Sequence, residues 1–179
     1  AALEGFKNPV YVAEAVSETE YRVLAGAGAA EFASYRNFEM VNRKQMSSRG
    51  GQDFSTSSST DTVGCVAFDG TTFAAGLSTG GKAGVQYGRV GDVPILGSGL
   101  YAGPKGAVAT TGDGEAIIMN MTAFRVYQFI EKGIAPDKIL KEVLGWFPES
   151  DAFGIIVVTR KGYAGGANRS MAWSAKAFY

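Results

Sequence analysis

Residues 47–79 read SSRGGQDFSTSSSTDTVGCVAFDGTTFAAGLST, and their character changes abruptly at Thr62. Glycine, serine and threonine dominate the first part, which has too few apolar side chains to pack, so we interpret residues 37–61 as a flexible linker. Two apolar runs then flank Asp69-Gly70, a dipeptide that favours a tight turn between antiparallel strands. The stretch therefore predicts a β-hairpin that begins with a hydroxyl residue directly after a flexible segment.

The rest of the chain alternates helical and strand patterns. Before the linker, we expect a helix over 8–19 with Asn8 as N-cap and Pro9 in its first turn, a short strand over 21–26, and a helix over 28–36. After the hairpin, we expect a strand over 106–112, a long helix over 114–133 capped by Asp113 and ended by Gly133, a helix over 136–147, and a second hairpin over 153–167. These elements indicate one layered α+β domain of 179 residues.

Composition excludes several classes of partner. Lysine and arginine together number 17, as do aspartate and glutamate, and no long run of one sign occurs, so neither nucleic acid nor a membrane surface is expected to bind. No apolar run approaches the roughly 18 residues of a membrane span, and the first residues do not resemble a signal peptide. The single cysteine, Cys65, cannot form an internal disulfide and is interpreted as a small buried residue. We therefore expect a cytoplasmic protein.

The sequence contains no histidine, so a catalytic reaction needs another base. Cleavage between Asp61 and Thr62 would create an α-amine with a pKa of about 7.7 to 8.0, which can accept the proton of the hydroxyl on the same residue. A flexible segment before the cut would let the preceding chain bend and then move away. Taken alone, however, Thr62 is better explained as a strand residue with a local hydrogen bond.

Three further groups of polar residues have two interpretations each. Arg89 and Asp92, between glycines, could hold the carboxylate and ammonium of an α-amino acid, or form a surface ion pair. The segment 110–112, Thr-Thr-Gly before a helix, could donate hydrogen bonds to an oxyanion or cap the helix. Ser78 and Thr79 would bring a hydroxyl close to Thr62 if the hairpin forms, or simply belong to a turn.

Four segments in this order resemble the β-subunit of the N-terminal-nucleophile amidohydrolases, which include plant-type asparaginase/isoaspartyl peptidase, glycosylasparaginase and taspase. They are DTVGCVAFD from residue 61, LSTGG from residue 77, GRVGDVPILGSG from residue 88 and ATTGDGE from residue 109. LEGFKNPVYVAEAV and VLAGAGAAEFA, within residues 1–36, resemble the end of the α-subunit. The resemblance implies a four-layer αββα sandwich with residues 62–179 as the β-subunit, and with the usual N-terminal strand of the family lacking from this chain.

The resemblance also implies a role for each site residue. Autoproteolysis at Asp61-Thr62 would release Thr62 as the nucleophile. The other roles are Thr79 orienting the nucleophile, Thr111 and Gly112 forming the oxyanion hole, and Arg89, Asp92 and Gly114 binding the α-carboxylate and α-amine of the substrate. No cofactor or catalytic metal is implied.

Asp92 after the arginine, and the tail GGANRSMAWSAKAF from residue 165, resemble the asparaginase/isoaspartyl peptidase branch. The implied substrates are L-asparagine and small β-aspartyl dipeptides. A glycosylasparaginase-like or taspase-like threonine hydrolase is the alternative within the family, and a truncated non-catalytic relative that binds amino acids or a partner is the alternative outside catalysis. The family also implies an oligomer of processed α/β pairs. The lacking N-terminal strand leaves three alternatives: a fragment, an N-terminal segment supplied separately by a partner, or a reduced variant.

Overall fold

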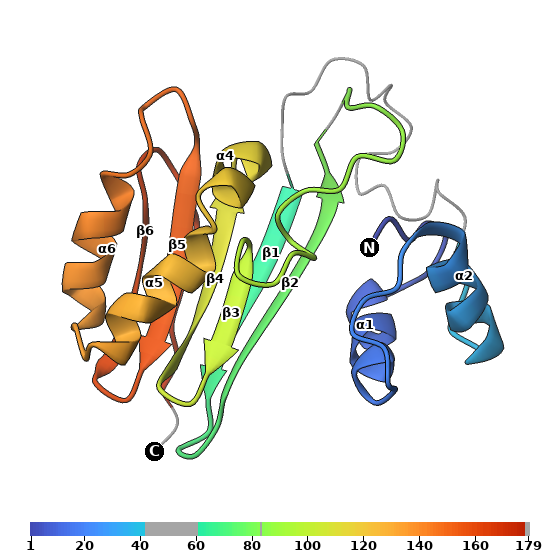
Figure 1. The fold of residues 1–179 in the computed structure, drawn as a ribbon, viewed down its shortest axis with the longest axis horizontal. Coiled ribbons are helices and arrows are strands. Elements are labelled where there is room, and N and C mark those ends of the chain that lie inside the picture. Colours follow the sequence, from blue (N-terminus) through green and yellow to red (C-terminus); the bar gives the residue numbers. More distant parts are fainter. Residues whose placement is uncertain (42–60, 83, 178–179) are drawn as a thin grey trace. The chain divides into compact units, whose positions relative to one another are not determined.

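The computed structural model describes residues 1–41, 61–82 and 84–177, which form two compact units (Figure 1). The first unit comprises Ala1–Asp61 with Gly80–Val90, and the second comprises Thr62–Thr79 with Gly91–Tyr179. Helices and antiparallel strands both occur, which confirms the expected α+β class. Every helix in the described ranges falls short of the length and apolarity that a bilayer-crossing segment needs.

The first unit contains two helices, α1 (Pro9–Ser17) and α2 (Gly26–Tyr35), as predicted. Asn8 occupies the N-cap position of α1 with a left-handed φ of 50°, and its side chain makes no capping bond. A small core of Phe6, Val12 and Ala33 joins the helices. The chain after α2 returns to its own beginning, where Met40 forms a β-bridge with Phe6. This bridge lies within the predicted linker, whose residues 42–60 are outside the described residues.

The predicted strand over residues 21–26 is wrong. Two backbone groups there bond the first residue of the chain, since the Ala1 amine donates to the Leu24 carbonyl at 2.7 Å and Gly26 N–H donates to the Ala1 carbonyl at 3.0 Å. Tyr21 N–H donates to the nearby Thr19 hydroxyl at 3.1 Å. Val23 is 66% exposed. A strand requires a neighbouring strand to satisfy its backbone, and a single residue does not provide one.

The second unit is built on a four-stranded antiparallel sheet in the order β3-β4-β5-β6. Its strands are β3 (Leu100–Gly103), β4 (Gly106–Gly112), β5 (Phe153–Thr159) and β6 (Gly162–Ala167). The strand over 106–112 and the hairpin over 153–167 are thus confirmed. Sequence analysis missed β3, because four residues that include a glycine are too few to show an alternating pattern.

Helices α5 (Thr122–Glu131) and α6 (Pro136–Leu144) cover one face of this sheet (Figure 1). Alternate residues of β4 and β5 point to that face because side chains of a strand alternate between its two sides. Val108, Ile155 and Val157 are buried there at 0–1% exposure against Val126, Ile139 and Val143 of the helices. Burial of this apolar surface supplies the main core of the unit.

The predicted helix over 114–133 is broken in two, which corrects the sequence analysis. Its first part is α4 (Gly114–Met119), and Met121, with a left-handed φ of 47°, separates it from α5. The Thr122 hydroxyl donates to the Ile117 carbonyl at 3.0 Å and stabilises the break. Both predicted ends are confirmed, since the Asp113 side chain accepts from Ala116 N–H at 3.1 Å and Gly133 follows the helix with a φ of 74°.

The predicted hairpin is confirmed as β1 (Asp61–Phe68) and β2 (Phe73–Gly81), which form a separate two-stranded sheet. The Asp69 carboxylate accepts from the N–H groups of Thr71 at 2.8 Å and Thr72 at 2.7 Å, and these bonds shape the turn and lower the pKa of Asp69. The hairpin packs on the face of the four-stranded sheet opposite the helices. A Cβ at Gly64 of β1 would lie 3.7 Å from the Ala109 Cβ of β4.

The other face of β1 is exposed, which corrects the interpretation of Cys65 as a buried residue. Val63 on the same face is 70% exposed. Odd-numbered residues of β1 point away from the four-stranded sheet, whereas Thr62 and Gly64 point toward it. An apolar pattern could not reveal which face of the strand would be covered.

Arg160 fastens the hairpin turn to the turn between β5 and β6. Its guanidinium donates to the Gly70 carbonyl at 3.3 Å and the Thr71 carbonyl at 3.2 Å, and it stacks 5.0 Å from the ring centroid of Phe68. The Phe68 and Phe73 rings in turn stack on each other at 4.1 Å. The turn end of the hairpin is therefore held by both hydrogen bonds and ring contacts.

Replacing Arg160 with methionine should lower the free energy of unfolding by about 1 kcal/mol, because the apolar chain remains while the hydrogen bonds and the charge over the rings are lost. Thermal unfolding measures this loss. Lys138→Met, which removes an exposed charge from α6, is the matched control and should change stability by less than about 0.5 kcal/mol. Equal unfolding temperatures for the two variants would contradict a stabilising role for Arg160.

Candidate active site

Thr62 and Thr79 meet at the open end of the hairpin. The Thr62 hydroxyl donates to the Thr79 hydroxyl oxygen at 3.1 Å, and both residues are half-buried. Both lie on the hairpin face that points toward the four-stranded sheet, because antiparallel pairing places residues of neighbouring strands on the same side. The predicted proximity of the two hydroxyl residues is confirmed. A hydroxyl at this distance can orient another hydroxyl for attack.

The two threonines at the end of β4 point to opposite faces. Thr110 is 2% exposed, and its hydroxyl donates to the Gly99 carbonyl at 3.0 Å, so it is occupied on the helix side of the sheet. Thr111 is half-buried on the hairpin side, where it lines a pocket together with Thr62. Of the two hydroxyls, that of Thr111 lies on the side of the sheet that faces Thr62.

Gly112 ends β4 in a conformation that requires glycine. Its φ is 134°, and a Cβ at this position would overlap the carbonyl oxygen of Ala152. Gly112 pairs with Phe153, whose N–H and carbonyl both bond Asn168 on the far side of β5, at 2.9 and 3.0 Å. Residue pairs of an antiparallel ladder alternate between hydrogen-bonded and non-hydrogen-bonded pairs, and Gly112–Phe153 is of the second kind because Phe153 bonds Asn168 instead. In such a pair the N–H and carbonyl groups of both residues point away from the partner strand. The Gly112 N–H therefore points away from β5, at the open end of the strand.

Residues 113 and 114 begin helix α4. The Asp113 N–H donates to the Ala152 carbonyl at 2.7 Å, and its side chain caps the helix. Gly114 is buried in the first turn. The capping interpretation is thus correct for Asp113, while the oxyanion-hole role of Thr111 and Gly112 stays a prediction.

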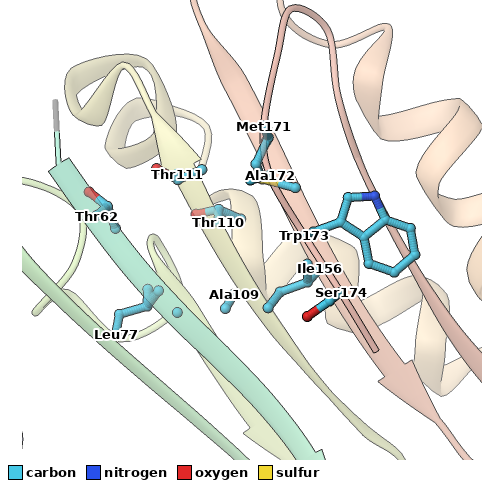
Figure 2. Close-up of a pocket in the computed structure, with 12 residues that line it drawn as sticks. Thr62, Leu77, Ala109, Thr110, Thr111, Ile156, Met171, Ala172, Trp173 and Ser174 are labelled. Atoms are coloured by element: carbon cyan, nitrogen blue, oxygen red, sulfur yellow. The ribbon is translucent and has the colours of Figure 1, made fainter. Parts of the chain in front are cut away.

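A pocket of about 220 Å³ lies between the hairpin and the sheet, beside Thr62 and Thr111 (Figure 2). Leu77, Ala109 and Ile156 give it apolar walls. Its remaining lining residues are Gly64, Thr110, Gly154 and the tail residues Met171, Ala172, Trp173 and Ser174. The pocket thus combines a polar end at the two threonines with an apolar interior, as small-molecule sites commonly do.

The tail reaches the pocket because two glycines leave room for it. A Cβ at Gly154 would lie 2.5 Å from the Met171 sulfur, and a Cβ at Gly165 would lie 2.7 Å from the Trp173 ring. Sequence analysis did not assign these tail residues to the site. The glycines in β5 and β6 were the available signal, since a strand glycine often marks the close approach of another group.

Asp92 lies in the loop that precedes β3. It is 7% exposed, so a surface ion pair is a wrong description of its carboxylate. Its carbonyl accepts from Ile95 N–H at 2.9 Å and Gly99 N–H at 3.2 Å, and a Cβ at Gly99 would lie 3.0 Å from the Asp92 carboxylate oxygen. Arg89 is half-buried and belongs to the first unit, as does Asp61, so their roles beside Thr62 remain predictions. In the described ranges, no cluster of three or more Cys, Asp or Glu side chains is arranged to hold a metal ion.

Comparison with known proteins identifies the family. A family model described as Asparaginase matches residues 44–178. The plant-type L-asparaginase of Thermococcus kodakarensis is 33% identical over 95% of this chain and 64% of the relative, and the human isoaspartyl peptidase/L-asparaginase is 33% identical over 98% and 63%. The N(4)-(β-N-acetylglucosaminyl)-L-asparaginase of Elizabethkingia miricola is 32% identical over 80% and 46%.

The chain therefore belongs to the asparaginase family of N-terminal-nucleophile hydrolases, which confirms the resemblance. It spans 64% of the length of the Thermococcus relative.

Gly112→Ala should destabilise the second unit by more than about 2 kcal/mol, because the added methyl group would overlap the Ala152 carbonyl at a φ that disfavours any side chain. Denaturant unfolding measures the change. Gly76→Ala in β2 is the matched control, since a Cβ there meets no atom within 4 Å. If both variants unfold at the same denaturant concentration, the close approach at Gly112 is wrong.

Proposed function

We propose that the protein is a threonine amidohydrolase that is cleaved between Asp61 and Thr62 and then uses Thr62 as its nucleophile. The observation that carries this proposal is the hydrogen bond of 3.1 Å between the Thr62 and Thr79 hydroxyls, beside Thr111 in the same pocket. Membership of the asparaginase family supports it. Cleavage would make Thr62, the second residue of β1, the first residue of a new chain.

The chemistry follows from the groups that Thr62 would then carry. Its α-amine accepts the proton of its own hydroxyl while the hydroxyl oxygen attacks the side-chain amide carbon of the substrate. The C–N bond breaks, the leaving nitrogen takes the proton, and an ester between Thr62 and the aspartyl group remains. Water then attacks the ester, the amine again removes a proton, and aspartate leaves with the hydroxyl restored.

The remaining site residues have proposed roles in binding and charge stabilisation. Thr79 orients the Thr62 hydroxyl. The Thr111 hydroxyl and the Gly112 N–H donate to the oxyanion, which the direction of that N–H supports. Asp92 and Arg89, with Gly114, hold the α-amine and α-carboxylate of the substrate. Burial of Asp92 strengthens such an ion pair because water screens it less.

The proposed substrates are L-asparagine and small β-aspartyl dipeptides, since the Thermococcus relative is named an L-asparaginase and the human relative an isoaspartyl peptidase/L-asparaginase. Glycosylated asparagine is the second candidate, supported by the Elizabethkingia relative. The released product distinguishes these reactions. It is ammonia from asparagine, an amino acid from a β-aspartyl dipeptide, and a sugar amine from glycosylated asparagine.

We also propose the four-layer αββα arrangement for the whole enzyme. Helices, the four-stranded sheet and the hairpin account for three successive layers within the second unit, and helices on the outer face of the hairpin would be the fourth. A cytoplasmic location and an oligomer of processed α/β pairs are further proposals, which rest on the lone cysteine and on the family respectively.

Incubation of the purified chain should cleave it between Asp61 and Thr62. Intact mass spectrometry detects the two resulting fragments. Thr62→Ala should remain uncut, because no hydroxyl is left to attack the preceding carbonyl, whereas Thr62→Ser should be cut slowly. Thr71→Ala, at the opposite end of the hairpin, is the control and should be cut like the unaltered chain. A chain that stays whole on prolonged incubation while hydrolysing substrate would refute the proposed nucleophile.

Activity of the cleaved enzyme should fall as the pH drops below about 8, the pKa of a terminal amine, because the protonated amine cannot accept the hydroxyl proton. Well below this pKa the rate should fall about tenfold for each pH unit. Initial rates with asparagine and a β-aspartyl dipeptide from pH 9 to pH 6 measure the profile. A rate that is constant over this range would show that another group is the base.

A further inference from the structure

Two adjacent side chains after β6 bind a run of carbonyl groups before β5. The Asn168 amide donates to the Asp151 carbonyl at 2.8 Å and to the Pro148 carbonyl at 3.4 Å. Arg169 donates from Nε to the Glu149 carbonyl at 2.8 Å and from Nη2 to the Ser150 carbonyl at 3.0 Å, with a further contact from Nη2 to Glu149. We call this arrangement, Asn168 and Arg169 on the carbonyls of residues 148–151, the carbonyl clasp.

The need of the loop carbonyls for hydrogen-bond donors does not by itself explain the carbonyl clasp. Residues 148–150 are exposed, so water could bond their carbonyls without ordering a long arginine side chain. Ordering the arginine side chain costs conformational entropy, and this cost is expected where a loop must keep one conformation. The clasp therefore points to a loop whose position matters to a neighbouring group.

The neighbouring group is the end of β4. Asn168 also accepts from Phe153 N–H at 2.9 Å and donates its own N–H to the Phe153 carbonyl at 3.0 Å, so it holds the residues on both sides of Ala152. The Ala152 carbonyl accepts from Asp113 N–H at 2.7 Å and lies where a Gly112 side chain would have to be. The direction of the Ala152 carbonyl thus sets the backbone at residues 112–113.

We propose that Asn168, assisted by Arg169, is a positioning residue for the oxyanion hole of Thr111 and Gly112. This inference rests on the proposed function, in which the Gly112 N–H donates to the oxyanion. Asn168 lies on the other side of β5 from Gly112 and acts only through Ala152 and Phe153. Because an oxyanion hole stabilises the transition state more than the bound substrate, loosening it should lower kcat and leave KM nearly unchanged.

Asn168→Asp tests this inference with a nearly isosteric change. An oxygen that accepts from Phe153 N–H is kept, while the amide donor is replaced by an oxygen that repels the carbonyls of residues 148 and 151. The matched control is Asn120→Asp at the end of α4, where the amide likewise donates to a backbone carbonyl, that of Ala116, at 2.9 Å. Both variants lose hydrogen bonds that the side-chain amide donates to backbone carbonyls. Of the two asparagines, Asn168 is the one that bonds the residues on both sides of Ala152.

Two measurements apply to the full chain and both variants. The first is amide hydrogen exchange of the peptide that contains residues 111–114, which should be at least tenfold faster in Asn168→Asp and unchanged in Asn120→Asp. The second is kcat per cleaved Thr62, with cleaved sites counted by intact mass. We expect at least a tenfold loss for Asn168→Asp with KM within twofold, and values within twofold of the unaltered enzyme for Asn120→Asp.

The outcomes separate this inference from the proposed function. An active unaltered enzyme in which Asn168→Asp changes neither exchange nor kcat would overturn the positioning role alone. The same holds if exchange becomes faster but kcat stays within twofold, or if both variants lose kcat in proportion to their loss of thermal stability. An unaltered chain that is neither cleaved nor active would overturn the proposed function, and the catalytic meaning of the carbonyl clasp with it.

Discussion

The β1–β2 hairpin and β4 belong to separate sheets, so side-chain packing, together with the Arg160 hydrogen bonds at the turn, holds the hairpin on the four-stranded sheet. Stacked sheets normally lie about 10 Å apart, a spacing set by the side chains between them. Here the side chains near Thr62 are small, since Gly64 faces Ala109 with Leu77 beside them. Small residues at this point allow a close approach and leave the pocket next to the two threonines.

This packing divides the proposed chemistry between two sheets. The attacking oxygen of Thr62 and its partner Thr79 belong to the hairpin, whereas Thr111 and Gly112 belong to the four-stranded sheet. The spacing of the two sheets therefore sets the separation between the proposed nucleophile and the proposed oxyanion donors. A reaction that depends on sub-ångström placement then requires firm contacts at both ends of the hairpin and at the end of β4.

Local signals in the sequence predicted the parts of the site that lie on one hairpin. The turn at Asp69-Gly70 sets the register of the strands, and the register brings Thr79 to Thr62. Elements that depend on distant contacts were not predictable in this way. The left-handed Met121 interrupts a helical pattern that looked continuous, and the role of Asn168 depends on carbonyls about 20 residues away. Side-chain bonds to distant backbone leave no periodic trace in a sequence.

The proposed cleavage makes specific demands on the hairpin, because it removes the covalent support of β1 at the residue that reacts. After the cut, Thr62 would be held only by pairing with β2 and by contacts with β4. At the turn, Arg160 binds the hairpin independently of the upstream chain. At the open end, the bond to Thr79 comes from β2, which is continuous with β1 through that turn. A strand supported at both ends in this way can lose its upstream connection and still present a free amine beside its hydroxyl.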